Sequence, residues 1–172
     1  MYLKFLLLTM IFLCSSLLAG NVNRDNSSAD FDIMNLVGEW EGEGFFVVPA
    51  TDIKVEIEGD GLFVYDSTNH RMRTSMNGTS LFINYADSGY LQYYPKTDSV
   101  SWEIWDSWGR HSMYWGVIDS NILRADRIFK NGKYRVKVTF PHPDTLDFHL
   151  RKHVTDSSNL DRAAFLLWRK KD

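Results

Sequence analysis

The stretch Gly38-Glu39-Trp40-Glu41-Gly42-Glu43-Gly44 decides the fold of this chain. Gly38 allows a sharp turn into a strand, and Trp40 offers a large apolar surface that can close one end of a barrel. Gly42 and Gly44 lie on the same face of the strand as Trp40, so they let it bend tightly or approach a neighbouring strand closely. The stretch therefore predicts the first strand of a small antiparallel barrel with a ligand-sized interior.

Apolar residues just before this strand have the spacing of a short helical turn: Phe31, Ile33, Met34 and Val37. We expect the apolar side of this turn to plug one end of the barrel, next to Trp40.

Period-two alternation dominates the rest of the chain and is clearest in residues 54–58, 134–140 and 146–151. Each run has one apolar and one charged face, as in a sheet with one side on a core. Turn signals separate the runs, and Asn131-Gly132 is the strongest because both residues tolerate positive φ. The pattern predicts an all-β, antiparallel up-and-down barrel of about ten strands with a short N-terminal helical plug. A two-sheet sandwich is the alternative, but hairpin-length connections leave few long crossovers for one.

The first nineteen residues have the layout of a signal peptide: Lys4, an apolar run over residues 5–13, and small residues before a cleavage site near Ala19 or Gly20. The apolar run is short for a transmembrane helix, which needs roughly 20 residues. A lipid anchor at Cys14 is a second alternative, disfavoured by the bulky Leu13. We expect a signal peptide at 1–19, a flexible tether at 20–30 and the barrel domain at 31–172.

Cleavage would remove Cys14, the only cysteine, and leave a mature chain without disulfides or thiol chemistry. An exported protein without disulfides fits a bacterial periplasm or surface better than an animal secretion. We therefore expect a periplasmic or secreted protein. The formal charge would change from −3 to −4, because Lys4 is the only charged residue of the leader. This charge argues against nucleic acid or an anionic membrane as a partner, and no integral membrane span is expected in the mature chain.

Residues 36–44, Leu-Val-Gly-Glu-Trp-Glu-Gly-Glu-Gly, resemble the opening of the calycin superfamily, the lipocalins and their relatives. The stretch is more similar still to bacterial lipocalin-like domains and to nitrobindin-like haem-binding barrels. The resemblance implies that a basic residue from the end of the barrel packs on Trp40, and Arg169 is the candidate. It also implies that Gly38, Trp40 and Arg169 are structural residues of a closed floor.

The resemblance to nitrobindin-like proteins implies a haem-ligating histidine in the last strand. Residues 163–169 contain none, and Phe165 falls near that position. The sequence therefore predicts no cofactor, unless His111 or His149 reaches the interior to bind haem. The five histidines have no zinc-site spacing, so no metal is expected either.

Aromatic residues are densest between Tyr90 and Trp115. Alternation places Trp102, Ile104 and Asp106 on one face of a strand, and Met113 and Trp115 on one face of the next. Such a cluster can line a pocket or be ordinary core. The predicted ligand-binding residues, at the end of the barrel opposite Trp40, are Tyr93, Trp102, Ile104, Asp106, Arg110, His111, Met113 and Trp115.

These features favour a lipocalin-like protein that binds a small apolar or amphipathic ligand inside its barrel. The alternative is a protein-interaction barrel of the cell envelope with a filled core, which requires Trp105 and Tyr114 on the outside. A haem-binding protein is the third reading. The sequence favours no enzymatic activity, because it has no nucleophile elbow and no phosphate-binding loop.

Overall fold

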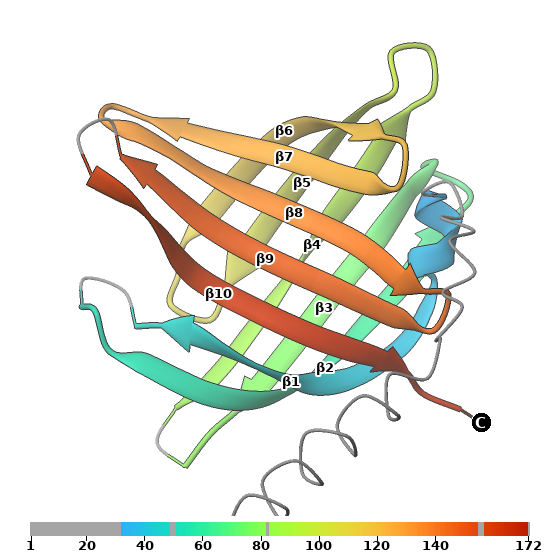
Figure 1. The fold of residues 1–172 in the computed structure, drawn as a ribbon. Coiled ribbons are helices and arrows are strands. Elements are labelled where there is room, and N and C mark those ends of the chain that lie inside the picture. The colour runs from blue at the N-terminus through green and yellow to red at the C-terminus, as the bar shows by residue number, and fades with distance from the viewer. Residues whose placement is uncertain (1–31, 49–50, 82, 155–156, 172) are drawn as a thin grey trace, which may run out of the picture.

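The computed structural model describes residues 32–48, 51–81, 83–154 and 157–171, which form ten antiparallel strands and one short 3-10 helix (Figure 1). The elements are η1 (Ile33–Leu36), β1 (Gly38–Val47), β2 (Lys54–Asp66), β3 (Arg71–Thr79), β4 (Asn84–Tyr94), β5 (Ser99–Asp106), β6 (His111–Asp119), β7 (Ile122–Phe129), β8 (Gly132–His142), β9 (Thr145–Val154) and β10 (Ser157–Arg169). The predicted all-β class is confirmed. The expected signal peptide, tether and Phe31 lie outside the described residues.

The strands form a closed up-and-down barrel. Every pairing but one joins strands that follow one another in the chain, and the exception, β1 with β10, closes the ring. Its register runs from Trp40 opposite Arg169 to Phe46 opposite Ala163. Each described strand thus has a paired neighbour on both sides, which a two-sheet sandwich would not achieve. The pairing of β6 with β7 is the shortest and joins only Trp115–Asp119 to Ile122–Asp126.

Glycines on β1 allow its close approach to β10. A Cβ atom built on Gly44 would lie 2.0 Å from the carbonyl oxygen of Ala164, and one on Gly42 would lie 2.1 Å from that of Leu166. No larger residue fits either position unless the strands separate. The glycines of the opening motif are therefore required by the way the barrel closes.

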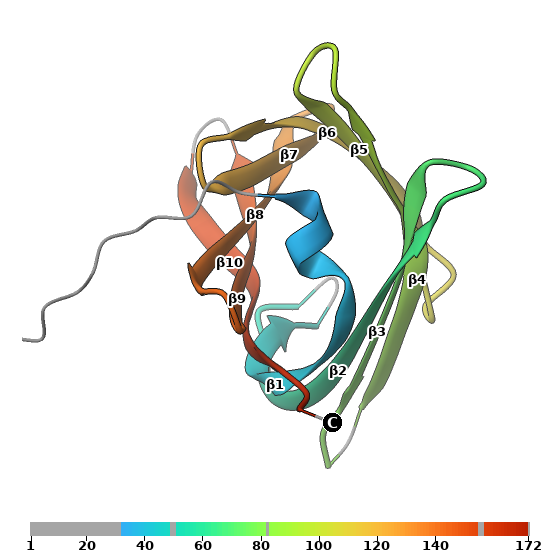
Figure 2. The same cartoon turned by 90° about the vertical axis from the view of Figure 1, so that its right-hand side faces the viewer.

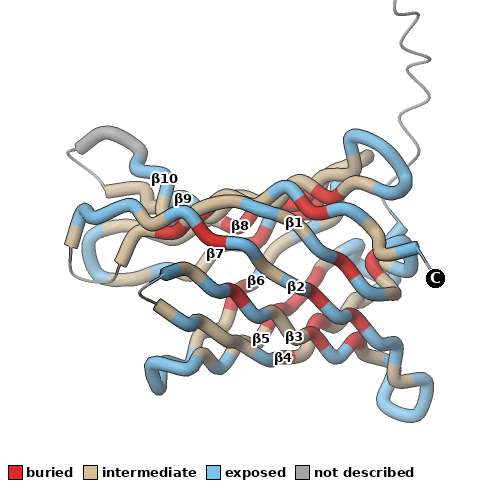
Figure 3. Tube along the Cα trace, turned by 90° about the horizontal axis from the view of Figure 1, so that it is seen from below, coloured by how far each residue is buried: buried red, intermediate tan, exposed pale blue. Residues whose placement is uncertain are grey.

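Burial alternates along the strands, as Figure 3 shows by the red positions that recur between exposed ones. The main core lies in the half of the barrel that contains the start of β1 and the end of β10. Its buried members are Leu36, Trp40, Phe63, Met72, Leu91, Val100, Trp102, Tyr114, Leu123, Ala125, Val136, Val138, Leu146 and Leu167. A smaller cluster of Phe46, Ile57 and Ala163 lies towards the other end.

The 3-10 helix η1 lies at the filled end of the barrel, within the ring of strands (Figure 2). Asp32 caps it by accepting a hydrogen bond from the Met34 backbone N–H at 2.8 Å. Leu36 is buried in the main core, and its carbonyl oxygen accepts a 2.8 Å hydrogen bond from the Trp40 indole N–H. The helix and Trp40 thus form one closed floor. Of the residues predicted for the plug, Ile33 and Val37 pack against the main core, whereas Met34 is exposed and Leu36 takes the buried position.

Arg169, the last residue of β10, connects the last strand to this floor. Its guanidinium carbon lies 4.4 Å from the centre of the Trp40 ring, a cation–π contact. Its two terminal nitrogens donate to the carbonyl oxygens of Val37 and Asn35 at 2.6 and 2.7 Å. Gly38 has a φ of +132°, and a Cβ there would lie 2.7 Å from the guanidinium, so glycine suits the position in both respects.

Replacing Trp40 with alanine should therefore destabilise the fold severely. Trp40 is fully buried, so Trp40→Ala leaves a large cavity and an unpaired Leu36 carbonyl. We expect the free energy of unfolding, measured with urea, to fall by about 3–5 kcal/mol. Trp115→Ala is the matched control, because Trp115 is 57% exposed; equal losses in the two variants would contradict the assigned floor.

Candidate functional site

A cavity of about 620 Å³ occupies the half of the barrel opposite the Trp40 floor. Three small residues, Gly59, Gly78 and Ala163, are among those that line it. The aromatic and aliphatic side chains of the lining are Phe46, Val47, Met76, Tyr85, Ile104, Trp108, Tyr114, Tyr134, Val136, Phe148, Leu150, Phe165 and Leu167. The lining is thus mainly aromatic and aliphatic, with small residues at a few positions.

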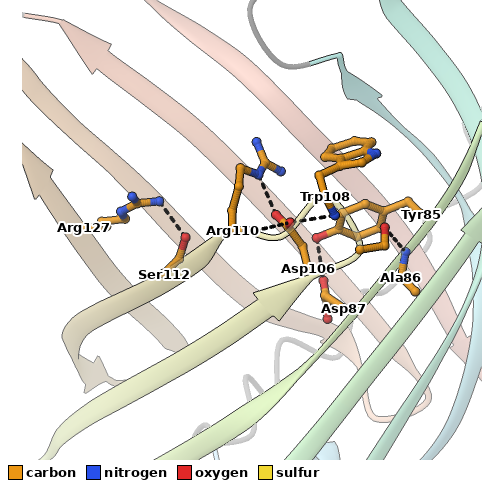
Figure 4. Close-up of polar contacts among 9 residues, drawn as sticks. Tyr85, Ala86, Asp87, Asp106, Trp108, Arg110, Ser112 and Arg127 are labelled. Carbon is orange, nitrogen blue, oxygen red and sulfur yellow. Dashed lines mark hydrogen bonds and ion pairs between the residues drawn. The ribbon is translucent and has the colours of Figure 1, made fainter.

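The turn between β5 and β6 forms part of the cavity wall at its mouth (Figure 4). One Asp106 carboxylate oxygen accepts the backbone N–H groups of Trp108 and Arg110, each at 3.0 Å, and the other accepts Arg110 Nε at 2.6 Å. The Trp108 ring lies 5.1 Å from that of Tyr85 and 5.5 Å from that of Phe46. Asp106 thereby fixes a turn that carries an aromatic wall residue.

Asp87 on β4 lies directly opposite Asp106 on β5. Its carboxylate accepts a 2.8 Å hydrogen bond from the Tyr85 hydroxyl. Burial, assisted by the negative charge of Asp106, raises the pKa of Asp87 to about 6, although the Tyr85 hydrogen bond acts in the other direction. Burial and the neighbouring Asp87 charge likewise raise the pKa of Tyr85.

Arg127, near the end of β7, reaches the cavity from another part of the wall. Its guanidinium donates a 2.6 Å hydrogen bond to the Ser112 hydroxyl on β6. Burial raises the pKa of the neighbouring Tyr114 phenol, and the charge of Arg127 opposes that rise. The cavity therefore combines an apolar lining with a few charged groups that face it.

The fold can be compared with solved structures. The structure of Rv2717c from M. tuberculosis superposes with a TM-score of 0.59 and 14% identity, covering 80% of this chain and 94% of that one. The S-type phycobiliprotein lyase CPES from Guillardia theta superposes with a TM-score of 0.52 and 12% identity, over 80% and 90% of the two chains. The fold is lipocalin-like. By sequence, no protein family and no curated protein matches the chain.

Within this lipocalin-like barrel, three of the predicted ligand-binding residues line the cavity: Ile104, Asp106 and Arg110. Trp102 belongs to the same face of β5 but lies deeper, in the main core, where its indole N–H donates to the Thr74 hydroxyl at 3.2 Å. Tyr93 packs against that core and donates to Asp98 at 2.6 Å. Trp102, Ile104 and Asp106, which alternation placed on one face of β5, thus all lie on its inner face.

Met113, Trp115 and His111, also predicted to bind ligand, lie instead on the outer face of β6 and line no part of the cavity. Trp115 is exposed and stacks on Tyr94 with 6.3 Å between ring centres. His111 stacks on Trp105 at 5.0 Å and pairs with Glu103 at 2.8 Å. The β6 residues that line the cavity are Ser112 and Tyr114.

The alternative hypothesis, a protein-interaction barrel with a filled core, requires both Trp105 and Tyr114 on the outer surface of the barrel. Trp105 is exposed, whereas Tyr114 is buried and borders the cavity. The second requirement is therefore wrong, and the interior is not packed solid. The outer aromatic residues of β4 to β6 remain a prediction for contact with another protein.

Most of the lining residues were not predicted as site residues, and Tyr85, Asp87, Trp108, Ser112 and Arg127 are among them. A signal for Arg127 is present in the sequence, because Leu123, Ala125 and Arg127 alternate on one face. An arginine that completes an otherwise apolar face of a barrel strand points inward. No comparable signal marks Ser112.

Neither histidine considered for haem reaches the cavity. His149 points outward from β9 and pairs with Asp147 at 3.0 Å, and His111 lies on the outer face of β6. Within the described ranges, no group of three or more histidine, cysteine or acidic residues is arranged to hold a metal ion. None of the described helices has the length and apolar character needed to cross a membrane.

The raised pKa of Asp87 predicts a pH-dependent stability. Between about pH 4 and pH 6 the folded chain holds a proton on Asp87 that the unfolded chain has lost, so stability falls as the pH rises through this range. Asp87→Asn cannot ionise and removes this contribution. From about pH 4 to pH 7, the native chain should lose roughly 1–3 kcal/mol of unfolding free energy relative to the variant. Urea unfolding of both proteins at several pH values in this range measures the difference. If the free energy of unfolding changed with pH to the same extent in both, the burial of a charged Asp87 would be contradicted.

Proposed function

We propose that the protein binds a small amphipathic molecule in the open half of its barrel. The observation that carries this proposal is the cavity of about 620 Å³ opposite the closed floor. Pockets for small molecules typically measure roughly 300–1,000 Å³ and combine an apolar lining with a few polar groups. The cavity has both properties.

The closed floor supports a binding function. Because the main core fills the other half of the barrel, a ligand would enter and leave at the mouth, beside Trp108. Apolar surface buried on binding contributes roughly 25 cal/mol per Å² before the costs of association are subtracted. The aromatic side chains of the cavity offer such surface, and the charged groups can orient the ligand.

The uncharged probe N-phenyl-1-naphthylamine tests this proposal without depending on charge. We expect its fluorescence to rise on binding to the native chain. Ala163→Phe places a ring in the cavity and should weaken binding by about tenfold or more, equivalent to roughly 1.4 kcal/mol or more.

Ala164→Phe is the matched control, because Ala164 is the next residue of β10 and points outward. It should change probe affinity by less than about twofold, equivalent to roughly 0.4 kcal/mol. Absence of probe binding to the native chain, or equal weakening in both variants, would refute the interior site.

We also propose that the protein is exported, on the basis of the three-part layout of residues 1–19. Expression of the full chain in a bacterium, followed by mass spectrometry of the periplasmic fraction, should find a protein beginning at residue 20 or 21. Recovery of only the uncleaved chain in the cytoplasm would contradict export.

A further inference from the structure

Of the described basic residues that line the cavity, some form ion pairs with carboxylates, and others do not. Asp106 forms its ion pair with Arg110 at 2.6 Å. Arg162 donates to the backbone carbonyls of Val48 and Thr51 and lies 3.6 Å from Asp52, so its charge serves the β1–β2 connection. The lining has two further basic residues, Arg127 and Lys152.

Arg127 has neutral partners. Its guanidinium donates a hydrogen bond to the Ser112 hydroxyl (Figure 4). It also lies beside the Tyr114 phenol. The adjacent Asp126 points outward, where Lys133 and Arg135 both bind it at 2.7 Å. Among the residues that the structure describes, no carboxylate forms an ion pair with Arg127. A half-buried guanidinium in this setting has donors available for an anion.

Lys152 lies in the same band of the wall. Arg127 on β7 is directly opposite Tyr134 on β8, which is directly opposite Lys152 on β9, and all three line the cavity. In the described part of the chain, no carboxylate pairs with Lys152 either; its ammonium group lies 5.9 Å from the Phe129 ring. Two positive charges and three hydroxyl groups, those of Ser112, Tyr114 and Tyr134, therefore occur in one region.

We infer that the ligand carries an oxyanion head, a carboxylate or a phosphate, bound by Arg127 with Lys152 and the neighbouring hydroxyl groups. This inference rests on the proposed function, because it specifies the ligand of the same cavity. A guanidinium can bind two oxygens of such a head with parallel hydrogen bonds, which are shorter and stronger than those between neutral groups. With an uncharged head, neither positive charge would have an anion in direct contact, because the described carboxylates of the lining, Asp52, Asp87 and Asp106, form no ion pair with either residue.

The apolar lining determines which way the ligand points. On β9 the inward residues run from Lys152 through Leu150 to Phe148 in the direction of the floor, and on β8 Val136 follows Tyr134 in that direction. The head therefore lies near the mouth, and the apolar tail extends towards the floor.

Three probes with the same alkyl chain test the inference: dodecanoate, dodecyl phosphate and dodecanol. Displacement of N-phenyl-1-naphthylamine gives their affinities at neutral pH. At least one anionic probe should bind the native chain about tenfold or more tightly than dodecanol. Which of the two binds better distinguishes a carboxylate from a phosphate head.

Arg127→Gln should remove this preference, with about a tenfold loss for the favoured anion and less than about a twofold change for dodecanol. Arg124→Gln is the matched control on the same strand, because Arg124 is exposed and pairs with Asp119 on the outside. It should leave all three affinities unchanged within about twofold. Dodecanol binding also shows that the Arg127 variant is folded, and Arg127→Lys should retain part of the preference.

A purely structural role for Arg127 predicts equal losses for all probes, which would overturn the inference. Equal affinity of the native chain for the anions and dodecanol would also overturn it, while leaving the proposed interior site intact. Failure of every probe, N-phenyl-1-naphthylamine included, would refute the proposed function itself.

Discussion

The contact between Arg169 and Trp40 is the constraint on which the rest of the structure depends. It joins the last strand to the first, and the same guanidinium satisfies the Val37 and Asn35 carbonyls at the end of η1. Carbonyl groups at a helix end need partners from outside the helix. One side chain thus holds the plug, the first strand and the last strand in a single arrangement, and the barrel is sealed at that end.

Because one end is sealed, the residues that form the main core are largely separate from those that line the cavity. Most fully buried large side chains lie in the floor half, so hydrophobic burial is concentrated there. The open half can then contain groups that oppose folding. Asp87 is one, because its raised pKa means that its ionisation destabilises the folded chain near neutral pH. Features that lower stability are tolerated at a functional site when the remaining core compensates for them.

The fold could be predicted from the sequence because its signals are local. Alternation within 134–140 and the Asn131-Gly132 turn each depend on residues close in the chain, and closure follows once most connections are hairpins. The site depends on which face of each strand points inward. For β5 the inward face was predicted correctly. On β6, Tyr114 and Trp115 are consecutive and both aromatic, so alternation alone could not show which of them points inward.

Arg127 shows why the remaining site residues were missed. Its partner Ser112 lies on β6, and Tyr134 and Lys152 reach its level only through the registers of β8 and β9. A one-residue slip of either strand would turn its side chain to the outside. Periodicity within a strand carries no information on the register between strands, which barrel closure fixes. Irregularities add to this, because Arg162 and Ala163 both line the cavity at a register shift of β10, where alternation fails.

The floor also bears on what the cavity can accept. From Lys152 to Leu146 at the floor, β9 rises by about 20 Å. With an anionic head at Arg127 and Lys152, the tail runs towards Trp102 and Leu167, which are already packed in the core. A longer tail would have to displace these side chains or leave the mouth beside Trp108. The Trp40–Arg169 contact, although far from the charged groups, therefore limits ligand length by holding the floor in place.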